Sequence, residues 1–318
     1  MKLVYAGAPA FSVPPLAALL GAGREVAAVL TQPPRPVGRK AVLTPTPLAA
    51  FAEERGIPVL AFARVREHVA ELRAAGADCM VTCAYGQILT DEVLAAFPAG
   101  VYNIHASLLP RWRGASPVQH AILAGDAETG ITVMRTERGL DTGDILLARA
   151  LQVSAQDTAG TLAEKLSALG GACICEALSR LERGEASFTV QDGSRATLCK
   201  KIEKADCLVD FSRPAEEVCR LVRAMSPAPL AYAYLRGAPV NFYFAEPCEG
   251  AASSVNGAAD AAPGTVLRAD KAGIVVAAGR GCVRILELQA AGGKRMRAAD
   301  FANGRKAAAG DVFTKEPQ

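Results

Sequence analysis

The sequence is poor in several features that mark specialised classes of protein. The chain of 318 residues has one tryptophan and three histidines, and aromatic residues make up only 5% of it. No stretch approaches ~18 uninterrupted apolar residues, the length of a membrane-spanning helix. The first residues also lack the basic flank and long apolar region of a signal peptide. We therefore expect a cytoplasmic protein without a membrane anchor.

An excess of one charge is also missing, because 35 Lys and Arg face 32 Asp and Glu for a net charge of +3. An RNA partner must therefore be argued from local basic clusters. The nine cysteines are odd in number, and none of their spacings has the second Cys/His pair of a zinc finger. Buried, reduced thiols and no metal site are predicted.

A dinucleotide fingerprint is absent as well. The first strand is followed by Ala6-Gly-Ala-Pro-Ala-Phe11 in place of G-x-G-x-x-G. Ala and Pro occupy positions where the backbone would have to approach a pyrophosphate, which disfavours NAD binding. Gly7 is interpreted as part of a tight turn that closes the strand.

What the chain does contain is a regular alternation of short apolar runs and helical patterns up to residue 183. This alternation predicts an α/β fold with a doubly wound, mostly parallel, Rossmann-like sheet. In the longest helical pattern, Thr158–Arg183, Thr161 and Glu164 have the spacing of a capping box. Beyond about residue 205 short β-rich runs predict a small barrel of the OB type, with one helix at Ala215–Met225 and a loop at Glu249–Pro263. We predict a catalytic domain at 1–183, a linker at 184–206 and a second domain at 207–318.

Polar side chains follow the strand predicted at Val101–His105. Asn103 and His105 are two residues apart, so they project on one side of the strand, and ligands gather at the carboxyl ends of such strands. Asp141 lies in a loop bracketed by Gly139 and Gly143, where its carboxylate can orient an imidazole and raise its basicity. Taken singly, an N-x-H pair more often satisfies local backbone groups, and Asp141 can be part of a turn or a loose cation site.

The motifs together carry a resemblance. Asn103, His105, Ser107–Pro110, Arg111–Gly114 and Leu140–Asp144 resemble the methionyl-tRNA formyltransferases, a family of folate-dependent formyltransferases. Further matches run from Ala6-Gly7 to Asn303-Gly304-Arg305 and so span nearly the whole chain. The resemblance implies transfer of a formyl group from 10-formyltetrahydrofolate to the α-amine of methionine on initiator tRNA, without a metal. The sequence contains no obvious pairing element, so we expect a monomer.

The resemblance also implies roles for individual residues. Asn103, His105 and Asp141 would be catalytic: the amide and a protonated imidazole would stabilise the tetrahedral oxyanion, and His105 would shuttle protons. The folate would lie on a loop whose apolar residues contact a flat ring, with a second wall opposite. These folate-binding residues are Ser107, Leu108, Leu109 and Pro110 on the loop, and Tyr85, Gly86 and Gln87 on the wall. Without the resemblance, a leucine pair is most often core packing.

Three basic clusters would contact the tRNA. They are Arg35, Arg39 and Lys40 in a loop after the second strand, Arg111, Trp112 and Arg113 beside the catalytic residues, and Lys294, Arg295, Arg297 and Arg305 in the barrel. Barrels of this type often hold nucleic acid through salt-sensitive phosphate contacts. The alternative is that these residues form a solvated charged face with a half-buried tryptophan.

Several positions depart from the family pattern, namely Ala8, Ala10, Ala41, Val42 and Ala228. They bear on tRNA contact rather than on the reaction. The alternative functions are formyl transfer to glycinamide ribonucleotide or an amino-sugar nucleotide, and a tRNA-binding protein that has lost catalysis. A glycinamide enzyme would not need a second domain, and retention of Asn103, His105 and Asp141 together argues against lost catalysis.

Overall fold

The computed structural model describes residues 1–38, 41–248, 261–304 and 306–317. Arg39, Lys40 and Arg305, and most of the predicted loop Glu249–Pro263, lie outside the described residues. The chain divides into two compact units. The first comprises Met1–Pro117, Glu128–Gln152 and Ala163–Lys200, and the second comprises Val118–Ala127, Val153–Leu162 and Lys201–Gln318. Residues 184–200, from the predicted linker, therefore cluster with the first unit, and the predicted domain boundaries remain a prediction.

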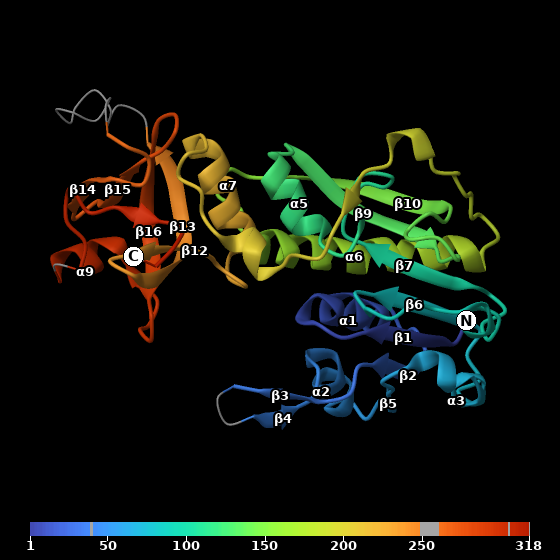
Figure 1. The fold of residues 1–318 in the computed structure, drawn as a ribbon. Helices are drawn as coiled ribbons and strands as arrows, with labels where there is room; N and C mark the ends of the chain where they lie inside the picture. Colours follow the sequence, from blue (N-terminus) through green and yellow to red (C-terminus); the bar gives the residue numbers. More distant parts are fainter. Residues whose placement is uncertain (39–40, 249–260, 305, 318) are drawn as a thin grey trace. The chain divides into compact units, whose positions relative to one another are not determined.

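A seven-stranded sheet of order β10-β9-β7-β6-β1-β2-β5 forms the first unit (Figure 1). The five neighbouring strands β5, β2, β1, β6 and β7 are parallel. The strand β9 is antiparallel to β7, and β10 is antiparallel to β9. Their bounds are β1 (Leu3–Gly7), β2 (Val26–Thr31), β5 (Val59–Ala61), β6 (Cys79–Cys83), β7 (Val101–His105), β9 (Glu128–Arg135) and β10 (Ile145–Gln152). The prediction of a mostly parallel sheet is confirmed.

Helices cover both faces of this sheet. On one face, α3 (Val69–Ala74) and α4 (Asp91–Leu94) bury Leu72 and Val93 against strand residues such as Met80. On the other face, α1 (Val13–Gly21) packs against α6 (Ala159–Glu182), where a Cβ added to Gly171 would lie 2.9 Å from Ala18 Cβ. The short α2 (Pro47–Glu53) follows β4 (Val42–Thr44). The doubly wound arrangement is therefore confirmed.

Gly7 lies where the ends of β1 and β6 approach each other. A Cβ at this position would lie 2.7 Å from the Cys83 carbonyl oxygen and 2.7 Å from Ser12 Cβ. Glycine is required here because both neighbours are too close for a side chain. Because β1, β6 and β7 are parallel neighbours, their carboxyl ends lie at the same edge of the sheet. Polar side chains of adjacent strands can form hydrogen bonds there.

The second unit is built around an antiparallel sheet of order β14-β15-β16-β13-β12-β18, with β17 paired to β16. Its strands are β12 (Ala231–Leu235), β13 (Ala238–Cys248), β14 (Val266–Asp270), β15 (Gly273–Ala277), β16 (Cys282–Ala290), β17 (Met296–Arg297) and β18 (Phe313–Thr314). A bridge between Thr265 and Val312 joins the two ends of the sheet. Phe313 N donates to the Gly264 carbonyl at 2.8 Å beside it. The sheet thus curls back on itself, as the predicted barrel requires.

Phenylalanines and one amphipathic helix fill this barrel. Phe211, Phe242 and Phe313 lie within 6.3 Å of one another, measured between ring centroids. The helix α7 (Ala215–Met225) buries Val218 and Val222. The described part of the second unit also includes most of α5 (Pro117–Ala124) and all of α9 (Ala298–Asn303). Among the described residues, no helix has the length and apolar character needed to cross a bilayer.

Some elements differ from the sequence-based expectation. Residues after β2 form a hairpin of β3 (Arg35–Val37) and β4 (Val42–Thr44), where a loop was predicted. The predicted capping box of Thr161 and Glu164 is wrong. Thr158 Oγ1 instead accepts from Thr161 N at 3.2 Å, and Thr161 Oγ1 accepts from Thr158 N at 3.0 Å. Because α6 begins at Ala159, Thr158 is its capping residue. Thr161 then occupies the position three residues later, where a capping box usually has Glu or Gln.

Candidate active site

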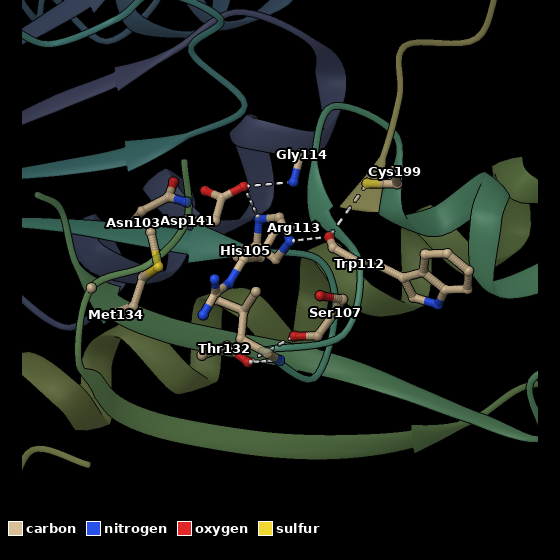
Figure 2. Close-up of polar contacts among 12 residues, drawn as sticks. Asn103, His105, Ser107, Trp112, Arg113, Gly114, Thr132, Met134, Asp141 and Cys199 are labelled. Carbon is tan, nitrogen blue, oxygen red and sulfur yellow. Dashed lines mark hydrogen bonds and ion pairs between the residues drawn. The ribbon is translucent and has the colours of Figure 1, made fainter. Parts of the chain in front are cut away.

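The structure brings the three predicted catalytic side chains together at the end of β7 (Figure 2). Asn103 is half-buried, whereas His105 is only 5% exposed. Asp141 reaches the site from the loop between β9 and β10, and its Oδ2 lies 3.6 Å from His105 Nδ1. That separation fits an ion pair without a direct hydrogen bond.

The amide of Asn103 is oriented by the neighbouring strand. Thr82, buried on β6, lies opposite Asn103 in the parallel register and donates its hydroxyl to Asn103 Oδ1 at 2.8 Å. Because this oxygen is the acceptor, the NH₂ group points elsewhere, and it makes no hydrogen bond to any residue in the described ranges. Asn103 therefore offers a free donor beside His105.

The imidazole of His105 lies between two acceptors. Nε2 is 2.9 Å from the Trp112 carbonyl oxygen, and since a carbonyl only accepts, this nitrogen carries a hydrogen. Nδ1 faces the Asp141 carboxylate. Both ring nitrogens of His105 therefore face hydrogen-bond acceptors.

Asp141 is held in an uncommon backbone conformation. Its φ of 51° is in the left-handed region, which costs a non-glycine residue energy. The carboxylate Oδ2 accepts from Gly114 N at 2.8 Å, and Gly114 itself has a φ of 122°. A Cβ on Gly114 would lie 2.3 Å from the Cys199 carbonyl oxygen, so only glycine fits between the two chain segments.

The predicted folate loop is bound firmly to β9. Thr132 Oγ1 donates to the Ser107 carbonyl at 2.7 Å and accepts from Leu109 N at 3.1 Å. Ser107 and Leu109 are buried, and the Leu109–Pro110 peptide bond is cis. Leu108 and Pro110 are half-buried. These last two residues are the apolar parts of the loop that a ligand can contact.

The predicted opposite wall lies after β6. Tyr85 is 4% exposed inside the core cluster of the sheet, and its hydroxyl has no partner among the described residues. Gly86 has a φ of 77° and is exposed. The Gln87 amide accepts from Val65 N and donates to the Phe62 carbonyl, both at 2.8 Å. The side chains of Tyr85 and Gln87 thus support the chain around them.

The predicted tRNA-binding residues differ in their surroundings. Arg35 on β3 and Lys294 are exposed. Arg111 stacks its guanidinium 4.3 Å from the Trp112 ring centroid, whereas Arg113 binds Gln191. Arg295 pairs with Glu287 and Arg297 with Asp300. The Arg297 guanidinium holds the pKa of the Asp300 carboxyl below its usual value. The barrel cluster is therefore partly neutralised.

Sequence reasoning missed the segment from Gln191 to Cys199, which folds back onto the site. Its strand β11 (Leu198–Cys199) pairs with β8 (Arg113–Gly114), and Thr197 Oγ1 accepts from Trp112 N at 2.9 Å. Burial raises the pKa of the Cys199 thiol. The thiol therefore keeps its proton and donates to the Trp112 carbonyl at 3.3 Å, as Figure 2 shows. No motif marks this segment, and the sequence shows only that several of its residues are polar.

Comparison with known proteins identifies the fold family. A formyl transferase family model matches residues 6–178, and a model of the formyl transferase C-terminal domain matches residues 201–306. A methionyl-tRNA formyltransferase of Chromobacterium violaceum is 46% identical over 98% of both chains. One from Coxiella burnetii is 43% identical over 95% of both chains. The chain belongs to the methionyl-tRNA formyltransferase family.

Solved structures agree with this family at the level of the fold. HypX from Aquifex aeolicus, solved with tetrahydrofolic acid, has a TM-score of 0.67 at 18% identity and covers 96% of this chain and 48% of its own. An N-formyltransferase from Helicobacter canadensis, solved with folinic acid and dTDP-3-aminofucose, has a TM-score of 0.65 at 16% identity over 90% and 98% of the two chains. Among the described residues, no cluster of His, Cys, Asp and Glu could hold a metal ion.

Proposed function

We propose that this chain transfers the formyl group of 10-formyltetrahydrofolate to the α-amine of methionyl initiator tRNA, giving N-formylmethionyl-tRNA for translation initiation. The observation that carries the proposal is the 43–46% identity, over 95–98% of the chain, to proteins named for this activity. The similarity to these relatives covers both units, which match the formyl transferase model and the model of its C-terminal domain.

In the proposed reaction the amine attacks the formyl carbon and produces a tetrahedral oxyanion. The free NH₂ group of Asn103 is suited to donate to this oxygen, because Thr82 occupies the other end of the amide. One such donor is worth ~3–4 kcal/mol of activation free energy in comparable acyl transfers. Once it has taken the proton of the amine, the His105 ring buried beside Asn103 would add favourable charge.

The reaction also moves a proton, which leaves the attacking amine and arrives at N10 of the folate. We assign this exchange to Nδ1 of His105, because the hydrogen on Nε2 is committed to the Trp112 carbonyl. Asp141 would stabilise the charged ring between the two transfers. Ser107, Leu108, Leu109 and Pro110 would carry the folate, with Leu108 and Pro110 presenting apolar surface to its ring.

Both units would take part in binding the acceptor tRNA. We propose that residues 1–183, together with the strand at Leu198–Cys199, perform formyl transfer and that residues 207–318 bind tRNA. The exposed cations Arg35, Arg111 and Lys294 would contact phosphates, and Trp112 would stack on a base. A charged initiator tRNA as acceptor places the reaction in the cytoplasm, where we propose that the chain acts as a monomer.

The decisive experiment offers the purified protein 10-formyltetrahydrofolate with three acceptors in separate reactions. They are methionyl initiator tRNA, glycinamide ribonucleotide and an amino-sugar nucleotide, with His105→Ala as the inactive reference. We expect transfer to the tRNA alone. Transfer to a small acceptor would overturn the assignment. A wild-type rate no higher than that of His105→Ala would identify a tRNA-binding protein without catalysis.

A further inference from the structure

We propose that Gln191 is a positioning residue for formyl transfer, which fixes the Asp141 carboxylate opposite His105. This role rests on the proposed function, since it gives Gln191 importance only through the catalytic pair. Gln191 belongs to the segment that follows α6, and its side chain is half-buried under the loops that carry Arg113 and Asp141.

The amide of Gln191 uses its full hydrogen-bonding capacity. Nε2 donates to the Asp141 carbonyl at 2.9 Å and to the Gly143 carbonyl at 2.7 Å. Oε1 accepts from Arg113 Nε at 3.1 Å and from Arg113 Nη2 at 2.8 Å. Carbonyls only accept and a guanidinium only donates, so the amide has one possible orientation. No other natural side chain of this length offers two donors and an acceptor in this arrangement.

These contacts lie on both sides of the hydrogen bond that aims the carboxylate. Asp141 Oδ2 accepts from Gly114 N, and Gly114 directly follows Arg113. Gln191 therefore holds both partners of this hydrogen bond. It binds the carbonyl of the acceptor residue Asp141, and it binds the guanidinium of Arg113, the residue before the donor Gly114. Removing the amide would free both loops at the same time.

The Asp141 loop needs this support because its backbone is under strain. Asp141 adopts a φ of 51°, while its neighbours Leu140 and Thr142 are exposed and contribute little packing. Gly143 is buried, and a Cβ there would lie 1.8 Å from the Arg135 carbonyl oxygen. The loop is thus held at Gly143 by close packing and at Asp141 by Gln191. The carboxylate position depends on the second contact.

The test uses two substitutions of Gln191 and one matched control. Gln191→Met removes the hydrogen bonds to Asp141, Gly143 and Arg113 at similar volume, and Gln191→Glu keeps only the acceptor for Arg113. Gln152→Met makes the same change at an exposed position of β10. We expect kcat to fall about 10- to 100-fold in both Gln191 variants, as for a misplaced catalytic group. The KM values for 10-formyltetrahydrofolate and methionyl-tRNA should stay within about twofold.

A spectroscopic readout separates positioning from general stability. The chain has three histidines, so the ring resonance of His105 can be assigned with His105→Ala. At one fixed pH this resonance should move in both Gln191 variants, while those of His68 and His120 should not. An unchanged His105 resonance, or an unchanged kcat, would overturn the proposal. If Gln191→Met fails to fold, Gln191→Glu decides alone.

The outcomes also separate this inference from the function on which it rests. Wild-type protein that does not formylate methionyl-tRNA would contradict the proposed function. In that case the His105 resonance still tests whether Gln191 positions the Asp141 carboxylate. Active wild-type protein with fully active Gln191 variants would contradict the positioning role alone.

Discussion

At the scale of single residues, the catalytic amide depends on a neighbour that no motif contains. Asn103 presents its NH₂ group because Thr82, on the adjacent strand, occupies the carbonyl end. The sequence placed Asn103 and His105 on one side of a strand, since alternation follows from the period of two. It did not reveal Thr82, because the pairing of β6 with β7 depends on tertiary structure. Gln191 was missed for the same reason.

Replacing Asn103 by Asp should remove the donor while keeping the size of the side chain. We expect kcat for methionyl-tRNA formylation to fall about 100- to 1,000-fold, as when an oxyanion donor is lost, with little change in either KM. Steady-state kinetics with both substrates varied would measure this. A variant with full kcat and a raised KM would show that Asn103 binds substrate without stabilising the oxyanion.

Replacing Thr82 by Val should leave the packing intact but free the Asn103 amide to rotate. Loss of one hydrogen bond, about 1 kcal/mol, corresponds to a fall in kcat of about fivefold. Thr82→Ser keeps the hydroxyl and is the matched control, for which we expect nearly wild-type kcat. Equal rates for the two variants would show that the hydroxyl does not orient the amide.

At the scale of elements, the two-residue strands β8 and β11 have a structural importance greater than their length suggests. Their pairing places Gly114 beside the Cys199 carbonyl, and Gly114 N then holds the Asp141 carboxylate. The alternating pattern predicted the long strands and helices well, because each has several turns or alternations to detect. Pairs as short as β8 and β11 have no period, so the sequence could not indicate them.

Gly114→Ala should displace this pairing, because the new Cβ would lie 2.3 Å from the Cys199 carbonyl oxygen and φ is 122°. We expect a loss of about 1–3 kcal/mol of stability from backbone strain, and a fall in kcat of at least about tenfold. Gly193→Ala, in the segment that carries β11 and with open space around it, is the control. Thermal unfolding and kinetics of the pair test the prediction, and equal behaviour would contradict it.

The end of α6 predicts a pH-dependent contribution to stability. Hydrogen bonding from Arg24 lowers the pKa of Glu182 from its ordinary value of 4.5. A carboxyl whose pKa is lowered on folding stabilises the protein above 4.5 and loses this effect as pH falls through the lowered value.

Glu182→Gln should therefore reduce stability by about 0.5 kcal/mol at pH 7, the size expected for a largely solvent-screened ion pair. The difference from wild type should shrink as pH falls below 4.5. Thermal midpoints measured along a pH series test this, with the exposed Glu53→Gln as control. A difference that is constant with pH would exclude the ion pair as its cause.

At the scale of the whole molecule, the sequence predicted a parallel-rich sheet followed by a barrel, and the structure contains both. Near residue 205 the sequence changes from alternating strand and helix patterns to short β-rich runs. This change predicts two kinds of sheet, because each class of sheet has its own pattern. The sequence could not show that the barrel cations have acidic partners. Arg295 binds Glu287 on β16, and Arg297 binds Asp300 on α9.

Binding of tRNA by exposed cations predicts a steep salt dependence of kcat/KM. Lys294→Ala should raise the KM for methionyl-tRNA and reduce the slope of log(kcat/KM) against log[salt] by ~0.7–0.9, the effect of one lost phosphate contact. The KM for the folate should not change. Lys271→Ala, an exposed lysine between β14 and β15, is the control. Equal slopes for both variants would remove Lys294 from the tRNA-binding surface.

The pairing of β8 with β11 has a consequence for biosynthesis. Arg113 and Trp112 bind partners 78 and 85 positions later in the chain, and Cys199 closes the arrangement 87 positions after Trp112. During translation, the sheet strands up to β10 emerge well before the segment that fixes the Asp141 loop. We therefore expect nascent chains ending before Gln191 to acquire a folded sheet without activity. An enzyme that acts at the start of protein synthesis would thus itself become competent only after about two thirds of its own chain has left the ribosome.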